Sequence, residues 1–136
     1  MAEVFQLEIV TPERQVVSDT AEEVQIPGKK GYLGILPGHA PLITELSVGE
    51  ITYRKGRHTS YLSVAWGFAE VLPTKVTILA EAAERPEEID VERAREARKR
   101  AEERLKSQDP ATDYDRALYA QQRAHVRLDV AARKHH

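Results

Sequence analysis

The first part of the chain alternates hydrophobic and polar residues with a period of two. Short runs of this kind, rich in β-branched and aromatic residues, occupy residues 5–10, 23–26, 50–54, 60–64 and 75–79. Glycine and proline signal turns between them, at residues 11–12, 27–28, 37–38, 48–49, 55–56 and 73–74. Since this pattern is typical of half-buried strands, residues 1–86 are predicted to form an all-β sandwich. Trp66 and Phe68 lie two residues apart, so both rings are expected on the core side.

After Pro86 the spacing of apolar residues becomes helical. One stripe contains Ala94, Ala97, Ala101 and Leu105, and a second contains Ala117, Ala120, Ala124, Leu128 and Ala131. A break falls at residues 107–110, and Asp90 and Asp113 stand where N-caps are expected. The short connection predicts an antiparallel hairpin over residues 87–136. The predicted fold class is therefore α+β, an N-terminal β-sandwich followed by a C-terminal antiparallel two-helix hairpin.

Alanine dominates both helical stripes, which limits what the hairpin gains by packing. A buried methyl group contributes only about 0.8 kcal/mol. The helices are good helix formers in themselves, but their apolar seam is thin. We therefore expect the hairpin to detach and reopen while each helix stays intact.

Composition narrows the possible functions of the 136 residues. Cysteine is absent, which excludes disulfides, thiolate metal sites and a cysteine nucleophile. No apolar stretch approaches the roughly 20 residues of a membrane helix, and the start of the chain lacks the pattern of a signal or transit peptide, so a cytoplasmic protein is expected. Residues 1–90 hold 8 Lys/Arg and 14 Asp/Glu, a net charge of −6, whereas residues 91–136 hold 12 and 8, a net charge of +4. The basic helices could meet nucleic acid, a membrane surface or an acidic protein patch.

The segment at residues 27–42 combines glycine, proline and apolar residues more densely than the rest of the chain. It does not fit a phosphate-binding loop, because no Lys-Ser/Thr pair and no helix pattern follow its glycines. His39 could act as a metal ligand or a general base, but no second ligand stands at a suitable spacing. The favoured interpretation is a histidine that fixes a turn by hydrogen bonding.

Arginines recur at helical spacing on both predicted helices. Arg93 and Arg100 are seven residues apart, and Arg123 and Arg127 are four apart. If these faces meet, four guanidinium groups converge, an arrangement that a bound polyphosphate would stabilise. The pattern alone favours the other interpretation, a solvated surface whose arginines alternate with glutamates.

A longer motif makes the chain resemble a known family. The string Gly31-x-x-Gly34-Ile35-x-Pro37-Gly38-His39-x-Pro41-Leu42 resembles the signature of the epsilon subunits of bacterial F-type ATP synthases, and the similarity extends along nearly the whole chain. The resemblance implies a non-catalytic rotor subunit. Its β domain would bind the gamma subunit of the central stalk and touch the membrane c-ring through residues 29–45. Tyr32 stands where some members carry an acidic residue.

The resemblance also implies roles for the helices. Residues 89–94 match the motif Ile/Leu-Asp-x-x-Arg-Ala of ATP-binding epsilon subunits. The adenosine part of ATP would lie near Glu84, Asp90 and Ala94, with the phosphates among Arg93, Arg100, Arg123 and Arg127. Opened helices would inhibit ATP hydrolysis by contacting the catalytic beta subunits, for which the candidate residues are Arg104 and Arg116.

The family implies no catalytic residue, no metal and no required cofactor, with ATP as a regulatory ligand. It also implies a peripheral position on the cytoplasmic face of the bacterial plasma membrane. Two other functions fit the sequence less well. A nucleotide hydrolase would need a Walker lysine and an acidic pair for magnesium, and neither is evident. A nucleic-acid adaptor would be expected to interleave aromatic residues with arginine, whereas residues 91–136 contain eight acidic residues instead.

Overall fold

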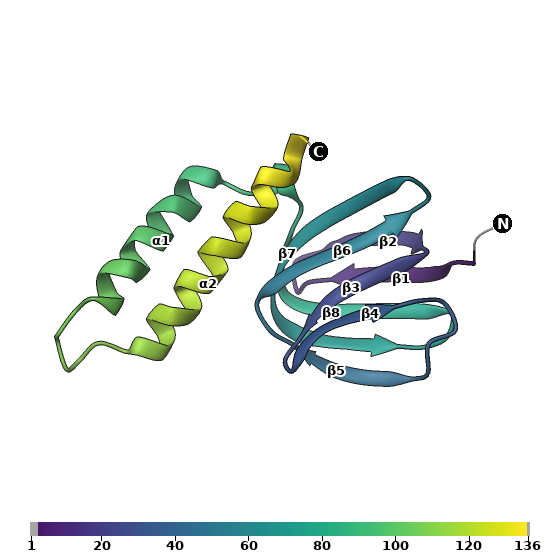
Figure 1. The fold of residues 1–136 in the computed structure, drawn as a ribbon, viewed down its shortest axis with the longest axis horizontal. Coiled ribbons are helices and arrows are strands. Elements are labelled where there is room, and N and C mark those ends of the chain that lie inside the picture. Colours follow the sequence, from purple (N-terminus) through teal and green to yellow (C-terminus); the bar gives the residue numbers. More distant parts are fainter. Residues whose placement is uncertain (1–2, 136) are drawn as a thin grey trace.

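The computed structural model describes residues 3–135 and consists of eight strands followed by two long helices (Figure 1). The strands are β1 (Phe5–Val10), β2 (Gln15–Ala21), β3 (Glu23–Gly28), β4 (Gly31–Ile35), β5 (Leu42–Leu46), β6 (Gly49–Lys55), β7 (His58–Val71) and β8 (Lys75–Glu84). A short 3-10 helix, η1 (Pro86–Glu88), leads to α1 (Val91–Leu105), α2 (Tyr114–Ala131) and the final 3-10 turn η2 (Ala132–His135). The predicted α+β class is confirmed.

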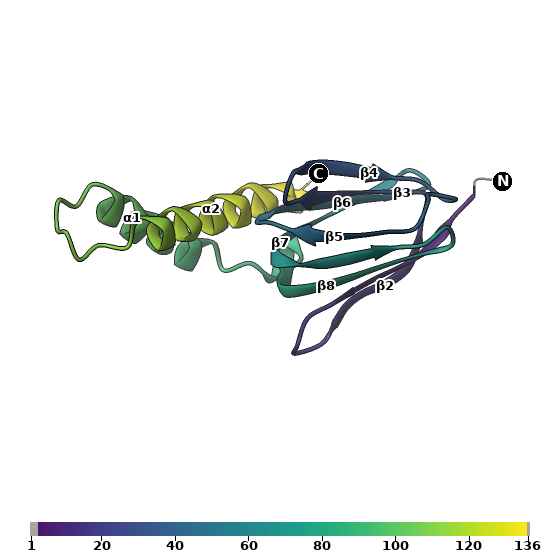
Figure 2. The ribbon, with the colours of Figure 1, turned by 90° about the horizontal axis from the view of Figure 1, so that it is seen from below.

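The long strand β7 joins the two layers of the sandwich (Figure 2). Its first half pairs with β6 and its second half with β5, while β8 pairs along most of its length. The strand order β2-β1-β8-β7-β5 continues through β3 to β4, and β6 bridges β3 and β7. All neighbours are antiparallel except β1 and β8, which are parallel.

The core forms between the layers because alternate residues of each strand point inward. Strand β1 shows this directly, since Phe5, Leu7 and Ile9 are buried and the residues between them are half-buried. The other fully buried large side chains are Ile26, Ile35, Ile51, Leu62, Ile78, Val17, Val24, Val71 and Val76. Each of the five predicted runs lies within a strand, and β2, β4 and β5 are additional.

The expectation that Trp66 and Phe68 pack in the core is wrong. Phe68 is 53% exposed on the outside of the sandwich, and Trp66 is half-buried against α2. The cause is a backbone irregularity where β7 changes partner, since Trp66 and Gly67 have φ angles of +49° and +138°. Before it, Leu62 and Val64 point inward; after it, Ala69 and Val71 do. The alternation therefore shifts by one residue.

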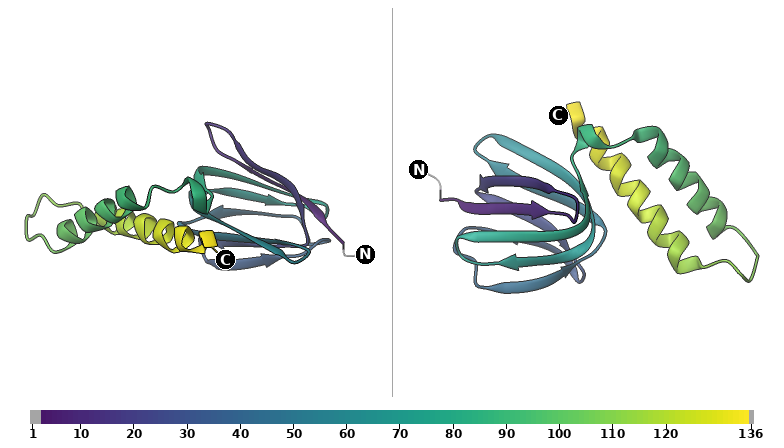
Figure 3. Two further views of the ribbon diagram at one scale, coloured as in Figure 1. Left: turned by 90° about the horizontal axis from the view of Figure 1, so that it is seen from above. Right: turned by 180° about the vertical axis from the view of Figure 1, so that it is seen from behind.

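The hairpin extends from one end of the sandwich (Figures 1 and 3). Both predicted caps are present, because Asp90 Oδ1 accepts from the Arg93 N–H at 3.1 Å and Asp113 Oδ1 from the Arg116 N–H at 3.0 Å. Helix α2 lies against β6 and β7, and α1 lies on the far side of α2. The sandwich thus holds the hairpin through α2.

Candidate functional site

The seam between the two helices is lined by alanines that recur every seven residues. Ala94 and Ala101 of α1 and Ala117 and Ala124 of α2 are each at most 2% exposed. Small side chains at this spacing let the two helices approach closely. The predicted alanine stripes are confirmed at these positions.

An arginine immediately precedes each of these four buried alanines. They are Arg93, Arg100, Arg116 and Arg123, and all four are exposed. Because successive residues turn by about 100° in a helix and the two helices run antiparallel, these arginines fall on the same side of the hairpin. Arg127, one turn after Arg123, lies on that side too. The fold therefore places Arg93, Arg100, Arg123 and Arg127 along one side of the hairpin.

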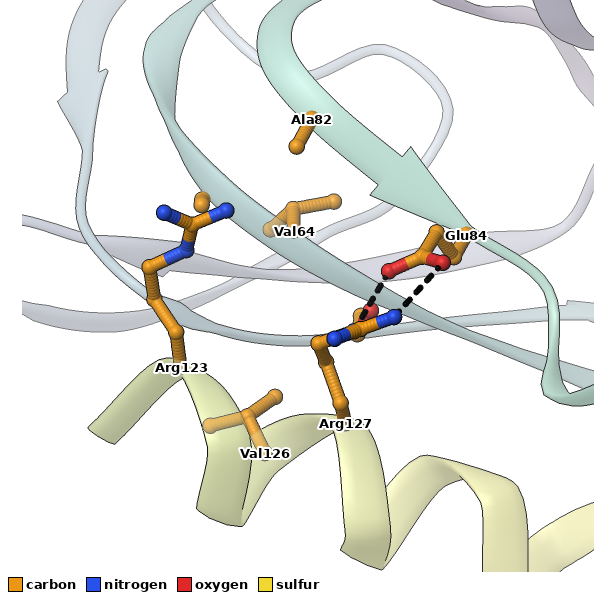
Figure 4. A pocket seen from close by; sticks show the side chains of 8 residues that line it. Val64, Ala82, Glu84, Arg123, Val126 and Arg127 are labelled. Carbon is orange, nitrogen blue, oxygen red and sulfur yellow. Dashed lines mark hydrogen bonds and ion pairs between the residues drawn. The ribbon is translucent and has the colours of Figure 1, made fainter. Parts of the chain in front are cut away.

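Arg127 forms an ion pair with the sandwich. Its Nε donates to Glu84 Oε1 at 2.7 Å and its Nη2 to Oε2 at 3.2 Å, a two-pronged ion pair between α2 and the end of β8 (Figure 4). Both side chains are less than a third exposed. Such paired contacts are among the stronger polar interactions in proteins.

Arg123 makes a different contact one turn earlier. Its guanidinium carbon lies 5.5 Å from the centre of the Trp66 ring, and that ring also meets Tyr119 edge to face at 5.8 Å. This stack is one aromatic contact between the hairpin and the sandwich. Sequence reasoning missed it, because Trp66 was assigned to the core.

The cavity between Arg123 and Arg127 is small. Its other lining residues include Val64, Ala82 and Glu84 of the sandwich, and Val126 of α2 (Figure 4). Its volume is about 10 Å³, room for roughly one water molecule. Arg93 and Arg100 make no ion pair within residues 3–135. The closed structure thus aligns the four arginines on one side without converging them on one point.

The remaining two candidate arginines lie toward the far end of the hairpin. Arg104 is in the last turn of α1 and Arg116 is in the first turn of α2, on either side of the connecting loop. Both side chains are exposed, and within residues 3–135 neither belongs to an ion pair. They remain accessible to another protein in the closed hairpin.

The glycine and proline segment forms β4, a tight loop and the start of β5. Gly31 and Gly38 have φ angles of +131° and +84°, so these two turns need glycine. Gly34 lies within β4, and the loop through Pro37, Gly38, His39 and Pro41 leads to Leu42 in β5. The His39 Nδ1 atom lies 2.7 Å from the Ala40 carbonyl oxygen, a contact that fits the turn-fixing interpretation.

The side chains around this loop form an exposed, partly apolar groove of about 660 Å³. Tyr32 and Leu42 contribute 60% and 36% exposed side chains to it. On its rim, Glu45 accepts a hydrogen bond from Lys29 and raises the pKa of that lysine. The groove therefore combines apolar side chains with the charged residues Lys29, Lys30 and Glu45.

A second apolar surface lies on the outer face of the sheet formed by β5, β7 and β8. Ile43, Phe68 and Leu79 are 71%, 53% and 56% exposed, and Phe68 is directly opposite Leu79. We call these three residues the outer patch. Each alternates with the buried residues of its strand and therefore points outward. That the three lie on one face follows from the pairing of the strands and could not be predicted from the sequence pattern.

Within residues 3–135, no group of three or more His, Asp or Glu side chains gathers where it could hold a metal ion. No helix there is both long and apolar enough to cross a membrane.

Comparison with known proteins places the chain in one family. The β-sandwich domain of the ATP synthase delta/epsilon chain matches residues 4–86, and the long α-helix domain of the same chain matches residues 87–132. The ATP synthase epsilon chain of Koribacter versatilis is 72% identical over 110 residues, which are 81% of this chain and 78% of that protein. Epsilon chain 2 of Syntrophotalea carbinolica is 48% identical over 134 residues, 98% of this chain and 97% of the relative.

The fold agrees with this grouping. A chain of the Euglena gracilis mitochondrial ATP synthase, solved by cryo-EM, superposes with a TM-score of 0.80 at 23% identity, covering 97% of this chain and 82% of that one. The resemblance drawn from the glycine and proline motif is confirmed. The chain therefore belongs to the ATP synthase delta/epsilon chain family, among the epsilon chains of bacterial F-type ATP synthases.

Proposed function

We propose that this protein is a non-catalytic rotor subunit of the ATP synthase central stalk. In this proposal the sandwich couples rotation to proton transport, and the hairpin controls ATP hydrolysis. The complex would hold the protein peripherally on the cytoplasmic face of the plasma membrane. The family match along both domains supports this function over a stand-alone nucleotide-binding or nucleic-acid-binding adaptor.

The two apolar surfaces of the sandwich suit two different partners. The outer patch of Ile43, Phe68 and Leu79 is the candidate contact with the gamma subunit, because three large apolar side chains are exposed on one sheet face. The groove around Tyr32 and Leu42 is the candidate contact with the membrane c-ring. The two surfaces share Ile43 of β5 and otherwise use different strands, β7 and β8 for the outer patch and β3 and β4 for the groove.

The observation that carries the regulatory proposal is the nature of the contact between hairpin and sandwich. The alanine seam stabilises the hairpin internally, whereas polar and aromatic contacts of partly exposed side chains join α2 to the sandwich beside Val126. These are the pair of Arg127 with Glu84 and the stack of Arg123 on Trp66. One such two-pronged pair contributes only about 1–2 kcal/mol and can form again when α2 docks. The hairpin can therefore leave the sandwich as a unit, after which Arg104 and Arg116 would contact the catalytic beta subunits.

ATP would favour the closed form by neutralising the arginine side of the hairpin. The nucleotide phosphates would bring Arg93 and Arg100 toward Arg123 and Arg127. The cavity of about 10 Å³ has no room for a nucleotide, so α2 must shift to admit it. A ligand at one hundred times its dissociation constant stabilises the bound state by about 2.7 kcal/mol. That is enough to shift a weakly held hairpin, and inhibition would strengthen as ATP falls.

Calorimetry on the isolated chain tests ATP binding. We expect one site, weaker binding of ADP, and a large loss of affinity in Arg93→Ala and Arg100→Ala. A variant at Arg95, whose guanidinium pairs with Glu92 instead, is the control and should bind normally. If no heat signal is detected at millimolar ATP, these arginines are solvated surface residues and do not bind the nucleotide.

Truncation tests the division of labour. A chain ending near Glu84 keeps all eight strands. It should still bind the gamma subunit, and the reconstituted enzyme should show relieved inhibition of ATP hydrolysis. Failure of the truncated chain to assemble, while remaining folded, would show that the helices contribute to assembly.

A further inference from the structure

A third contact between hairpin and sandwich lies in η2, directly after α2. The Arg133 guanidinium spans two strands of the sandwich from η2. Its Nη2 lies 3.2 Å from Glu50 Oε1 and its Nε 3.4 Å from Oε2, while its guanidinium carbon is 4.6 Å from the centre of the Tyr61 ring. Glu50 is on β6 and Tyr61 on β7. One side chain thus combines an ion pair with a cation–π contact.

The Glu50 side of this contact is built into the sandwich. Its backbone N–H donates to the Tyr32 hydroxyl at 3.0 Å, and its side chain is only 19% exposed. Gly49 allows this approach, because a Cβ atom there would lie 2.8 Å from the Tyr32 hydroxyl and 2.5 Å from Pro27 Cβ. The acceptor for Arg133 is therefore positioned by the same tyrosine that lines the groove at β4.

The surroundings keep the contact charged and reversible. Hydrogen bonding by Glu50, and then its negative charge, raise the pKa of Arg133, and an arginine guanidinium is charged at physiological pH in any case. An open groove of about 410 Å³, lined also by Asp129 and Val126, lies beside the pair. Water and salt can enter it, so the pair is held weakly enough to break.

We propose that Arg133 is a latch that holds the docked hairpin on the sandwich through its contacts with Glu50 and Tyr61. The proposal rests on the mobile hairpin of the proposed function and adds a residue outside the arginine side of the hairpin. The latch acts without nucleotide and fixes the C-terminal end of α2 on the sandwich. The hydrogen bond from the Glu50 N–H to the Tyr32 hydroxyl connects the latch to β4 and the groove that Tyr32 lines.

The single tryptophan makes the test direct, because Trp66 is covered by Tyr119 and Arg123 only while the hairpin is docked. Acrylamide quenching of Trp66 in the full-length chain, measured across urea concentrations below sandwich unfolding, follows undocking. Arg133→Gln and Glu50→Gln should each favour the undocked state about three- to tenfold. The double variant should add little beyond either single variant, and the swap Arg133→Glu with Glu50→Arg should restore most of the docking. Lys134→Gln removes the same charge one residue later and should have no effect.

The outcomes separate the latch from the mobile hairpin. An undocking transition that Arg133→Gln leaves unchanged would overturn the latch alone. Additive single variants, or a swap that restores nothing, would overturn it as well. If the parent chain shows no undocking before the sandwich unfolds, the mobile hairpin fails and the latch fails with it.

Discussion

Gly67 stands at the point where β7 changes partners, and Gly67→Ala is expected to destabilise the sandwich severely. Its φ angle of +138° lies in a region that only glycine occupies readily. A Cβ atom there would also lie 2.0 Å from the Leu79 carbonyl oxygen and 2.8 Å from Ala80 Cα. Both obstacles are backbone atoms of β8, which cannot rotate away, so the two strands would have to separate.

The expected cost combines two terms. The backbone conformation costs about 1–3 kcal/mol for a residue other than glycine, and forcing two packed strands apart costs roughly a further 1–3 kcal/mol. A total of about 2–6 kcal/mol is a large fraction of the roughly 5–15 kcal/mol that holds a domain together. Because Gly67 also sets the position of Trp66 beneath α2, the hairpin should loosen as well.

Urea unfolding followed by circular dichroism measures this loss, with Gly34→Ala as the matched control. An added Cβ at Gly34 meets no atom within 4 Å and its φ is not positive, so that variant should stay within about 1 kcal/mol of the parent. If a folded Gly67→Ala variant loses less than about 1 kcal/mol of unfolding free energy, a side chain at residue 67 does not strain β7 and β8 as argued.

Three further predictions concern the surfaces and the hairpin. Phe68→Asp should abolish binding to the gamma subunit in a pull-down while leaving the melting temperature nearly unchanged, because the ring is exposed; loss of folding would contradict this. The double change Arg104→Ala with Arg116→Ala should weaken inhibition of ATP hydrolysis more clearly than either single change, since exposed ion pairs contribute only about 0–1 kcal/mol each; full inhibition would remove the electrostatic explanation. Glu84→Gln and Arg127→Gln should each loosen docking by about 1–2 kcal/mol in the Trp quenching assay, and the double variant should cost little more, since both remove one ion pair.

Several features of this protein follow from local sequence alone. Period-two runs identified five of the strands, and the change to helical spacing after Pro86 identified the hairpin, because the period of burial is a property of each element by itself. Asp90 and Asp113 cap their helices as expected, since a cap needs only a carboxylate within three residues of free N–H groups. The glycine and proline motif indicated the family by its resemblance to a known signature, and the positive φ angles at Gly31 and Gly38 explain why glycine stands at those two positions.

Other features depend on contacts between segments that are distant in the sequence, and only the tertiary structure determines them. Trp66 and Phe68 lie outside the core because β7 exchanges one neighbour for another at Gly67, and no local pattern reports a change of partner. The outer patch required the registers of three strands, and the pairs Glu84–Arg127 and Glu50–Arg133 join residues 43 and 83 positions apart. The helical spacing placed the arginines on their helices, but only antiparallel packing puts them on one side of the hairpin. Pairing across such separations depends on how whole elements pack, which is why the docked hairpin could be recognised only in the folded chain.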